Sequence, residues 1–123
     1  MAEPTEIIQS IIESIQEKKG RDIVHIDLSK LEYAVTSGFV IGTGNTKIQV
    51  KAIADNVREY VQEKTGQKPY NYEGYQNSQW IVIDYGTVFA HIFLPEDRER
   101  YNLEELWADA DVNRIPNLDW HYS

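Results

Sequence analysis

The 123-residue sequence contains no cysteine, which excludes a disulfide framework, a zinc ribbon, an iron–sulfur site and a thiol nucleophile. It also lacks an apolar run near the roughly 20 residues of a membrane-spanning helix, and a basic region followed by a long apolar run at its N-terminus. We therefore expect a cytoplasmic protein with no membrane partner. The length fits one domain over residues 1–123, large enough to fold without disulfides or metals.

Basic residues are scarce as well. Twelve Lys and Arg stand against 20 Asp and Glu, which gives a formal net charge of −8. A field of this sign repels nucleic-acid phosphates and favours a basic partner, so we expect no direct DNA binding. An acidic composition also serves solubility alone. The charge therefore indicates a kind of partner without identifying it.

Motifs for catalysis are missing too. Metal-assisted phosphoryl transfer needs two carboxylates close together, whereas Asp27 and Asp84 each stand alone on a predicted strand. The three histidines lack the spacing of zinc ligands, and Gly42-Thr43-Gly44 lacks the lysine or third glycine of a phosphate-binding loop. Since there is no Gly-x-Ser-x-Gly either, we predict no catalytic residue, no metal site and no cofactor.

The most informative segment that is present covers residues 80–95, which reads as two apolar strands joined at Tyr85-Gly86. Side chains alternate along a strand, so two faces are expected: Trp80, Val82 and Asp84 point one way, and Ile81, Ile83 and Tyr85 point the other. One set belongs to the core. The other lies under a helix or forms an apolar surface with one carboxylate, and such a surface usually has a partner. Large, stiff aromatic side chains that often dominate interfaces include Trp80, Tyr85, Phe93, Tyr101 and Trp107.

The remaining periodicity predicts helices at residues 5–19, 46–65 and 102–107, and extended segments at residues 22–28, 38–42 and 70–75. Gly20 and Gly66 stand where the two long helices should end, and Thr46 and Gln49 have the spacing of a capping box. This order predicts an α/β domain with a mixed sheet of about five strands flanked by helices. From about residue 113 no period is clear, and we predict a flexible tail there.

Five blocks of the sequence, taken in order, resemble the ribosomal silencing factor family, also called iojap-like proteins. They are Phe39-Val40-Ile41 with Gly44-Asn45, Gln49-Val50-Lys51-Ala52-Ile53-Ala54-Asp55, Trp80-Ile81-Val82-Ile83-Asp84-Tyr85-Gly86, His91-Ile92-Phe93, and Arg98-Glu99-Arg100-Tyr101 with Leu103-Glu104-Glu105-Leu106-Trp107. The resemblance implies a nucleotidyltransferase-like α/β fold without the active site. It also implies binding to the large ribosomal subunit through its protein fourteen, which blocks joining of the small subunit and represses translation under nutrient limitation.

The partner-binding residues that this resemblance implies are Trp80, Asp84 and Tyr85, followed in rank by His91 and Phe93. The strand pattern alone also allows Trp80 to lie in the core, because tryptophans are highly buried on average. His91 can likewise be a partly buried histidine that hydrogen-bonds to the backbone.

Two other functions stay open at this point. One is a divalent-metal-dependent nucleotidyltransferase or phosphohydrolase that uses Asp27 or Asp84. The other is a homodimer of the free protein, in which the exposed strand face of one copy covers Trp80 of its twin.

Overall fold

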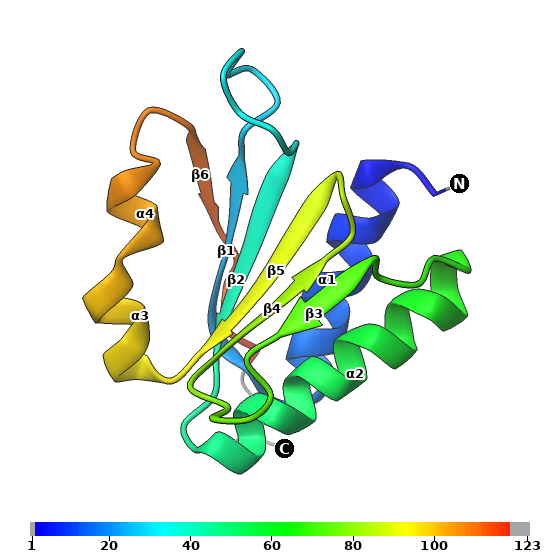
Figure 1. Ribbon diagram of the computed structural model, residues 1–123, viewed down its shortest axis with the longest axis vertical. Coiled ribbons are helices and arrows are strands. Elements are labelled where there is room, and N and C mark those ends of the chain that lie inside the picture. The colour runs from blue at the N-terminus through cyan, green and yellow to red at the C-terminus, as the bar shows by residue number, and fades with distance from the viewer. Residues whose placement is uncertain (1, 119–123) are drawn as a thin grey trace.

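The computed structural model describes residues 2–118, and within them the chain forms four helices and six strands. In chain order these are α1 (Pro4–Glu17), β1 (Arg21–Asp27), β2 (Gly38–Thr43), α2 (Lys47–Thr65), β3 (Asn71–Glu73), β4 (Trp80–Asp84), β5 (Val88–Phe93), α3 (Pro95–Tyr101), α4 (Leu103–Leu106) and β6 (Asp111–Arg114). The strands form one sheet in the order β3-β4-β5-β2-β1-β6 (Figure 1). β2 and β5 run parallel and all other neighbours antiparallel, which confirms the predicted α/β fold with a mixed sheet.

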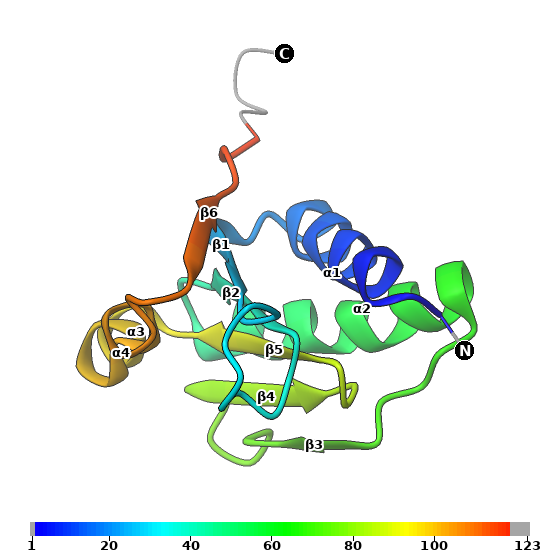
Figure 2. The same cartoon turned by 90° about the horizontal axis from the view of Figure 1, so that it is seen from above.

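The two faces of the sheet are covered unequally. In Figure 2, α1 and α2 lie together on one face, whereas α3 and α4 lie against only part of the other. Apolar side chains from α1 and α2 pack on alternate residues of β2, β4 and β5 to make the main core, which includes Ile7, Ile11, Ile15, Val50, Ile53, Val57, Val40, Ile81, Ile83, Ala90 and Ile92. Ile7, Ile11 and Ile15 recur at helical spacing, so they form one apolar stripe along α1, and this stripe covers the sheet.

The two ends of α2 follow the sequence signals. The Thr46 hydroxyl accepts a hydrogen bond from the Gln49 amide at 3.0 Å, and the Gln49 side chain accepts one from the Asn45 amide at 2.7 Å. Gly66 closes the helix with a left-handed φ of 76°. These contacts satisfy amides and carbonyls that a helix end leaves without partners, and they confirm the predicted start and end of α2.

The end of α1 differs from the prediction. The helix stops at Glu17, and Lys19 rather than Gly20 takes a left-handed φ, of 61°. Gly20 is needed for a different reason, because a Cβ there would collide with the Ile15 side chain. Close approach, and not backbone conformation, explains this glycine.

Two elements were not predicted. α3 begins at Pro95 with acidic residues in its first turn, but it is too short to show an apolar period. β6 lies where the tail was expected to begin, and its residues Asn113 and Arg114 pair with β1. Beyond β6, the Asn117 side chain accepts a hydrogen bond from the Asp22 amide at 2.8 Å. Residues 113–115 and Asn117 are therefore bonded to β1. Residues 119–123 of the predicted tail lie outside the described residues.

Gly74 controls how the chain enters β4. Its φ is +97°, and a Cβ at this position would collide with the carbonyl oxygen of Trp80, the first residue of that strand. Only glycine combines this backbone conformation with so close an approach. The turn between β3 and β4 thus packs directly against the backbone of Trp80.

Gly74→Ala is expected to lower the free energy of unfolding by more than about 2 kcal/mol, because the added methyl group meets backbone and also requires a strained φ. Gly66→Ala is the matched control, since its φ is also left-handed but nothing lies within 4 Å of an added Cβ. For the control we expect a loss of only about 1 kcal/mol. Urea unfolding followed by circular dichroism measures both, and equal losses would contradict the steric role of Gly74.

Candidate functional site

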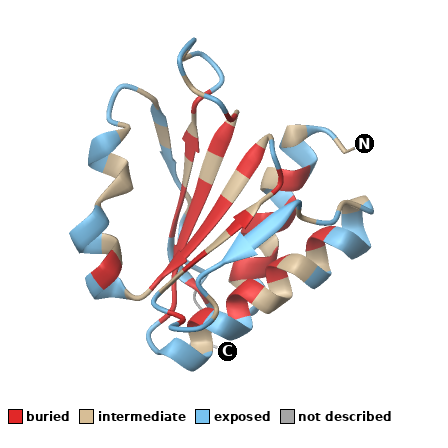
Figure 3. Ribbon diagram, in the orientation of Figure 1, coloured by how far each residue is buried: buried red, intermediate tan, exposed pale blue. Residues whose placement is uncertain are grey.

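The candidate site is the face of the sheet opposite α1 and α2. Burial alternates along β4 and along the first three residues of β2 and β5, where one face is fully covered and the other only partly (Figure 3). The last residues of β2 and β5 are buried on both faces. On this second face lie Phe39, Trp80, Phe89, His91 and Phe93, and we call these five side chains the aromatic face. The strand register places Trp80 opposite Phe93 and Phe39 beside Phe89. Strands β4, β5 and β2 therefore bring together residues that are far apart in the sequence.

Trp80 is half-buried at one end of this face. Its ring centroid lies 4.9 Å from that of Phe93 and 4.6 Å from that of Tyr101 on α3. The indole Nε1–H donates a hydrogen bond to Nδ1 of His91 at 3.0 Å. These contacts fix the orientation of the indole while leaving part of it accessible. Trp80 is thus not enclosed in the main core.

His91 holds the Trp80 indole in place through this hydrogen bond. Its side chain is buried, and burial lowers its pKa to about 4, so the imidazole is neutral near pH 7. Because Nδ1 accepts the indole hydrogen bond, the proton of the neutral ring must sit on Nε2. Burial of the His91 imidazole therefore leaves its Nε2–H without a hydrogen-bond partner in the described part of the chain.

The five predicted contact residues do not lie on one accessible surface. Tyr85 points into the main core with 2 % exposure, so its prediction as a contact residue is wrong: alternation places it on the side of Ile81 and Ile83. His91 and Phe93 belong to the aromatic face but are only 6 % and 1 % exposed, so they support Trp80 and offer little surface to a partner. Trp80 and Asp84 are half-buried on this face, and their contact role stays a prediction.

Aromatic side chains from outside the sheet border the aromatic face. Trp107, which follows α4, lies with its ring centroid 5.9 Å from Phe39 and stacks at 6.1 Å on the exposed Tyr33. Tyr101 is exposed beside Trp80. Tyr101 and Trp107 were candidates from residue type alone. The sequence analysis did not name Phe39 and Phe89 as site residues. Once β2 and β5 are known to pair, side-chain alternation along the two strands places both on the aromatic face.

Carboxylates lie along the β3–β4 side of the aromatic face. Asp84 is half-buried opposite Phe89, and its Oδ1 accepts a hydrogen bond from the Gly86 amide at 2.6 Å. Glu73 on β3 is exposed and pairs with Val82, which lies between Trp80 and Asp84 on the same strand face. An aromatic surface with negative charge at its edge is complementary to a partner that offers apolar groups surrounded by basic ones.

The carboxylates do not form a metal site. Two strands separate β1 from β4, so Asp27 and Asp84 are roughly 14 Å apart at the usual strand spacing. Asp27 instead accepts hydrogen bonds from Ser29, which lower the pKa of its carboxyl group. In the described part of the chain, no three His, Asp or Glu residues are grouped so that they could hold a metal ion. This geometry gives no support to two-carboxylate metal catalysis.

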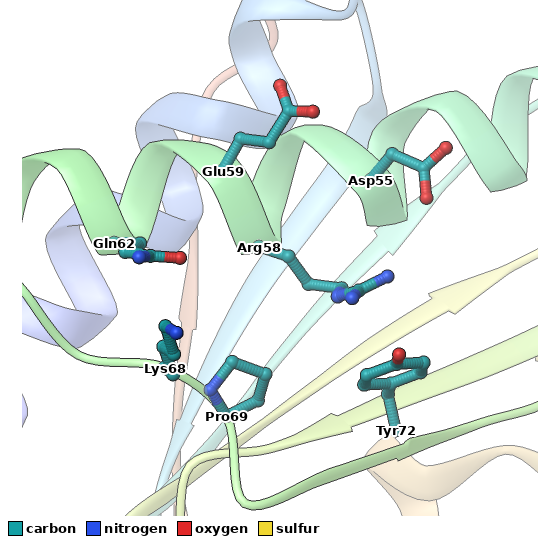
Figure 4. Close-up of a pocket in the computed structure, with 7 residues that line it drawn as sticks. All are labelled: Asp55, Arg58, Glu59, Gln62, Lys68, Pro69 and Tyr72. Atoms are coloured by element: carbon teal, nitrogen blue, oxygen red, sulfur yellow. The ribbon is translucent and has the colours of Figure 1, made fainter.

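A polar cleft of about 370 Å³ lies on the other side of the molecule, between α2 and the chain leading into β3. Its lining carries both signs of charge and no histidine, and consists of Asp55, Arg58, Glu59, Gln62, Lys68, Pro69 and Tyr72 (Figure 4). The Arg58 guanidinium lies 3.7 Å from the centre of the Tyr72 ring, a cation–π contact that joins α2 to β3. The cleft is thus bordered by a structural contact and contains no recognisable catalytic pair.

No helix within residues 2–118 has the length and apolar character to cross a bilayer.

Comparison with known proteins points to one family. The family model described as ribosomal silencing factor during starvation matches residues 1–121. A ribosomal silencing factor of Halalkalibacterium halodurans is 34 % identical over 113 residues, which cover 92 % of this chain and 95 % of that protein. A mouse protein named mitochondrial assembly of ribosomal large subunit protein 1 is 33 % identical, over 82 % of this chain and 45 % of its own length. A crystal structure of a Chromobacterium violaceum protein superposes with a TM-score of 0.81 at 30 % identity, covering 99 % of this chain and 100 % of that one.

The buried His91 makes stability depend on pH. As the pH falls from about 6.5 toward about 4, the unfolded chain binds a proton at this residue that the folded chain does not bind, so stability should decrease by up to about 3 kcal/mol. His91→Gln, which cannot titrate, should flatten this decrease in urea unfolding series between pH 7 and pH 4. Burial also lowers the pKa of His25, so His25→Gln measures its separate share. An unchanged pH dependence in His91→Gln would contradict the assignment.

Proposed function

Because the chain belongs to the ribosomal silencing factor family, we propose that it binds the large ribosomal subunit through its protein fourteen and sterically blocks joining of the small subunit. Translation is thereby repressed when nutrients are limiting. The observation that carries the proposal is the half-open aromatic face, in which Trp80 is held by His91, Phe93 and Tyr101. This mechanism requires that the protein bind the large subunit at a position where it blocks the small one, and it makes or breaks no covalent bond.

The rigidity of Trp80 supports a binding role. A side chain that is already held in one orientation loses little conformational freedom when a partner covers it. Tryptophan and tyrosine are also the residues most often found to dominate binding energy, particularly when surrounding contacts exclude water. Tyr101, Trp107 and Tyr33 around the aromatic face would supply such surrounding contacts.

The charge distribution supports a basic partner. The net charge of −8 attracts a basic surface at long range, and Asp84 and Glu73 place negative charge beside the aromatic face. The same charges repel the phosphates of ribosomal RNA. We therefore propose that the contact is made to a ribosomal protein and not to exposed RNA.

Trp80→Ala is expected to weaken binding to large subunits by about 2 kcal/mol or more, because it removes the half-exposed ring that His91, Phe93 and Tyr101 hold in place. Ile48→Ala is the control, since Ile48 is 83 % exposed on α2, on the opposite side of the sheet. Co-sedimentation with separated subunits, together with titration calorimetry against the isolated ribosomal protein, measures both variants. A folded Trp80→Ala protein that binds like the wild type would refute the proposed contact.

Light scattering of the same proteins at several concentrations tests for a homodimer that hides Trp80.

Asp84→Asn should weaken binding and reduce its dependence on salt. The amide keeps an oxygen that can accept the Gly86 hydrogen bond, so the change removes charge with little effect on the turn. In the wild type, added salt should screen attraction to a basic partner and weaken the complex. Affinities measured at several salt concentrations test this, and identical salt dependence in the two proteins would show that Asp84 does not face a basic group.

A further inference from the structure

The two short helices α3 and α4 carry the side chains that border the aromatic face. Tyr101 at the end of α3 packs on Trp80, and Trp107 directly after α4 packs on Phe39. The helices have only 7 and 4 residues, too few to be stable by themselves. Tertiary contacts must therefore fix the positions of these two rings.

One side chain makes many of those contacts. Arg98 on α3 donates from Nε and Nη2 to the two carboxylate oxygens of Glu104 on α4, at 3.1 and 3.2 Å. Its Nη1 donates to the Thr43 hydroxyl at 2.8 Å, at the end of β2, and to the Asp22 carbonyl oxygen in β1. Arg98 thus joins both helices to two strands of the sheet.

The geometry requires arginine. The guanidinium presents its donors in a planar fork, so it can hold one carboxylate with two nitrogens while a third reaches the strand ends. A lysine at this position has a single nitrogen and cannot reproduce this set of directions. The Arg98 side chain is only 12 % exposed, and Asp22, Thr43 and Glu104 already use its three nitrogens. It therefore has little capacity left to contact a partner directly.

We propose that Arg98 is a positioning residue: by tying α3 and α4 to the ends of β1 and β2, it sets where Tyr101 and Trp107 stand relative to Trp80 and Phe39. Its importance for ribosome binding rests on the function proposed above. The placement of the two rings by Arg98 does not, and it can be tested in the free protein.

The test compares Arg98→Met and Arg98→Lys with Arg100→Met in the full chain. Arg100 lies two residues further along α3, is exposed, and forms no ion pair within residues 2–118, so it is a matched control. Two-dimensional ¹H–¹⁵N NMR reports the indole signals of Trp80 and Trp107, while amide signals of α1 and α2 report the main core. Binding to large subunits is measured in parallel. Should Arg98→Met not fold, Arg98→Lys carries the test.

We expect both Arg98 variants to shift the Trp80 and Trp107 indole signals while the α1 and α2 signals stay in place, and to weaken binding by about tenfold or more. Arg100→Met should do neither. Unshifted indole signals in a folded Arg98 variant would overturn the placement of the two rings by Arg98. Binding within about twofold of the wild type would overturn its importance for ribosome binding. If the wild type itself does not bind large subunits, the proposed function fails, and the indole signals alone decide whether Arg98 places the two rings.

Discussion

The structure depends on the burial of one face of the sheet under α1 and α2. Four isoleucines of α1 and the valines of α2 fill this layer with side chains that are almost completely buried. Each contributes about 1.5–3 kcal/mol through loss of contact with water. Because this single layer holds the fold together, the opposite face can stay partly open without loss of the native structure.

The open face is organised by fewer and more specific contacts. Trp80 is held by a hydrogen bond to a buried neutral histidine, by the stacked ring of Phe93 and by the tilted ring of Tyr101. The helices that border it are held by the guanidinium of Arg98. A buried imidazole with one nitrogen lacking a partner within residues 2–118 is unfavourable for stability. This cost is understandable if a fixed indole is needed for binding, since natural proteins often accept strain and unsatisfied groups at functional sites.

Local signals predicted the regular parts of the fold well. The isoleucine spacing of α1, the Thr46–Gln49 capping contacts and Gly66 of α2, and the apolar runs of β2, β4 and β5 all carry their information within a few residues. α3 and β6 were missed because neither has a period of its own: α3 has 7 residues, and β6 is a polar edge strand of 4 residues that exists only by pairing with β1. Tyr85 was assigned to the wrong face because a family pattern was preferred to the strand alternation, which correctly puts it with Ile81 and Ile83.

The sequence by itself therefore determined the α/β class, the two covering helices, the acidic character and an aromatic strand pair that includes Trp80 and Asp84, because periodicity, capping and charge are local properties. Only the tertiary structure decided that β5 pairs with β2, so that Phe39 and Phe89 join Trp80, and that His91 and Phe93 lie beneath the indole and not at the surface. It also brought Arg98 to Asp22, Thr43 and Glu104. Strand order and long-range side-chain contacts join residues up to 95 positions apart, and no local pattern encodes such pairings.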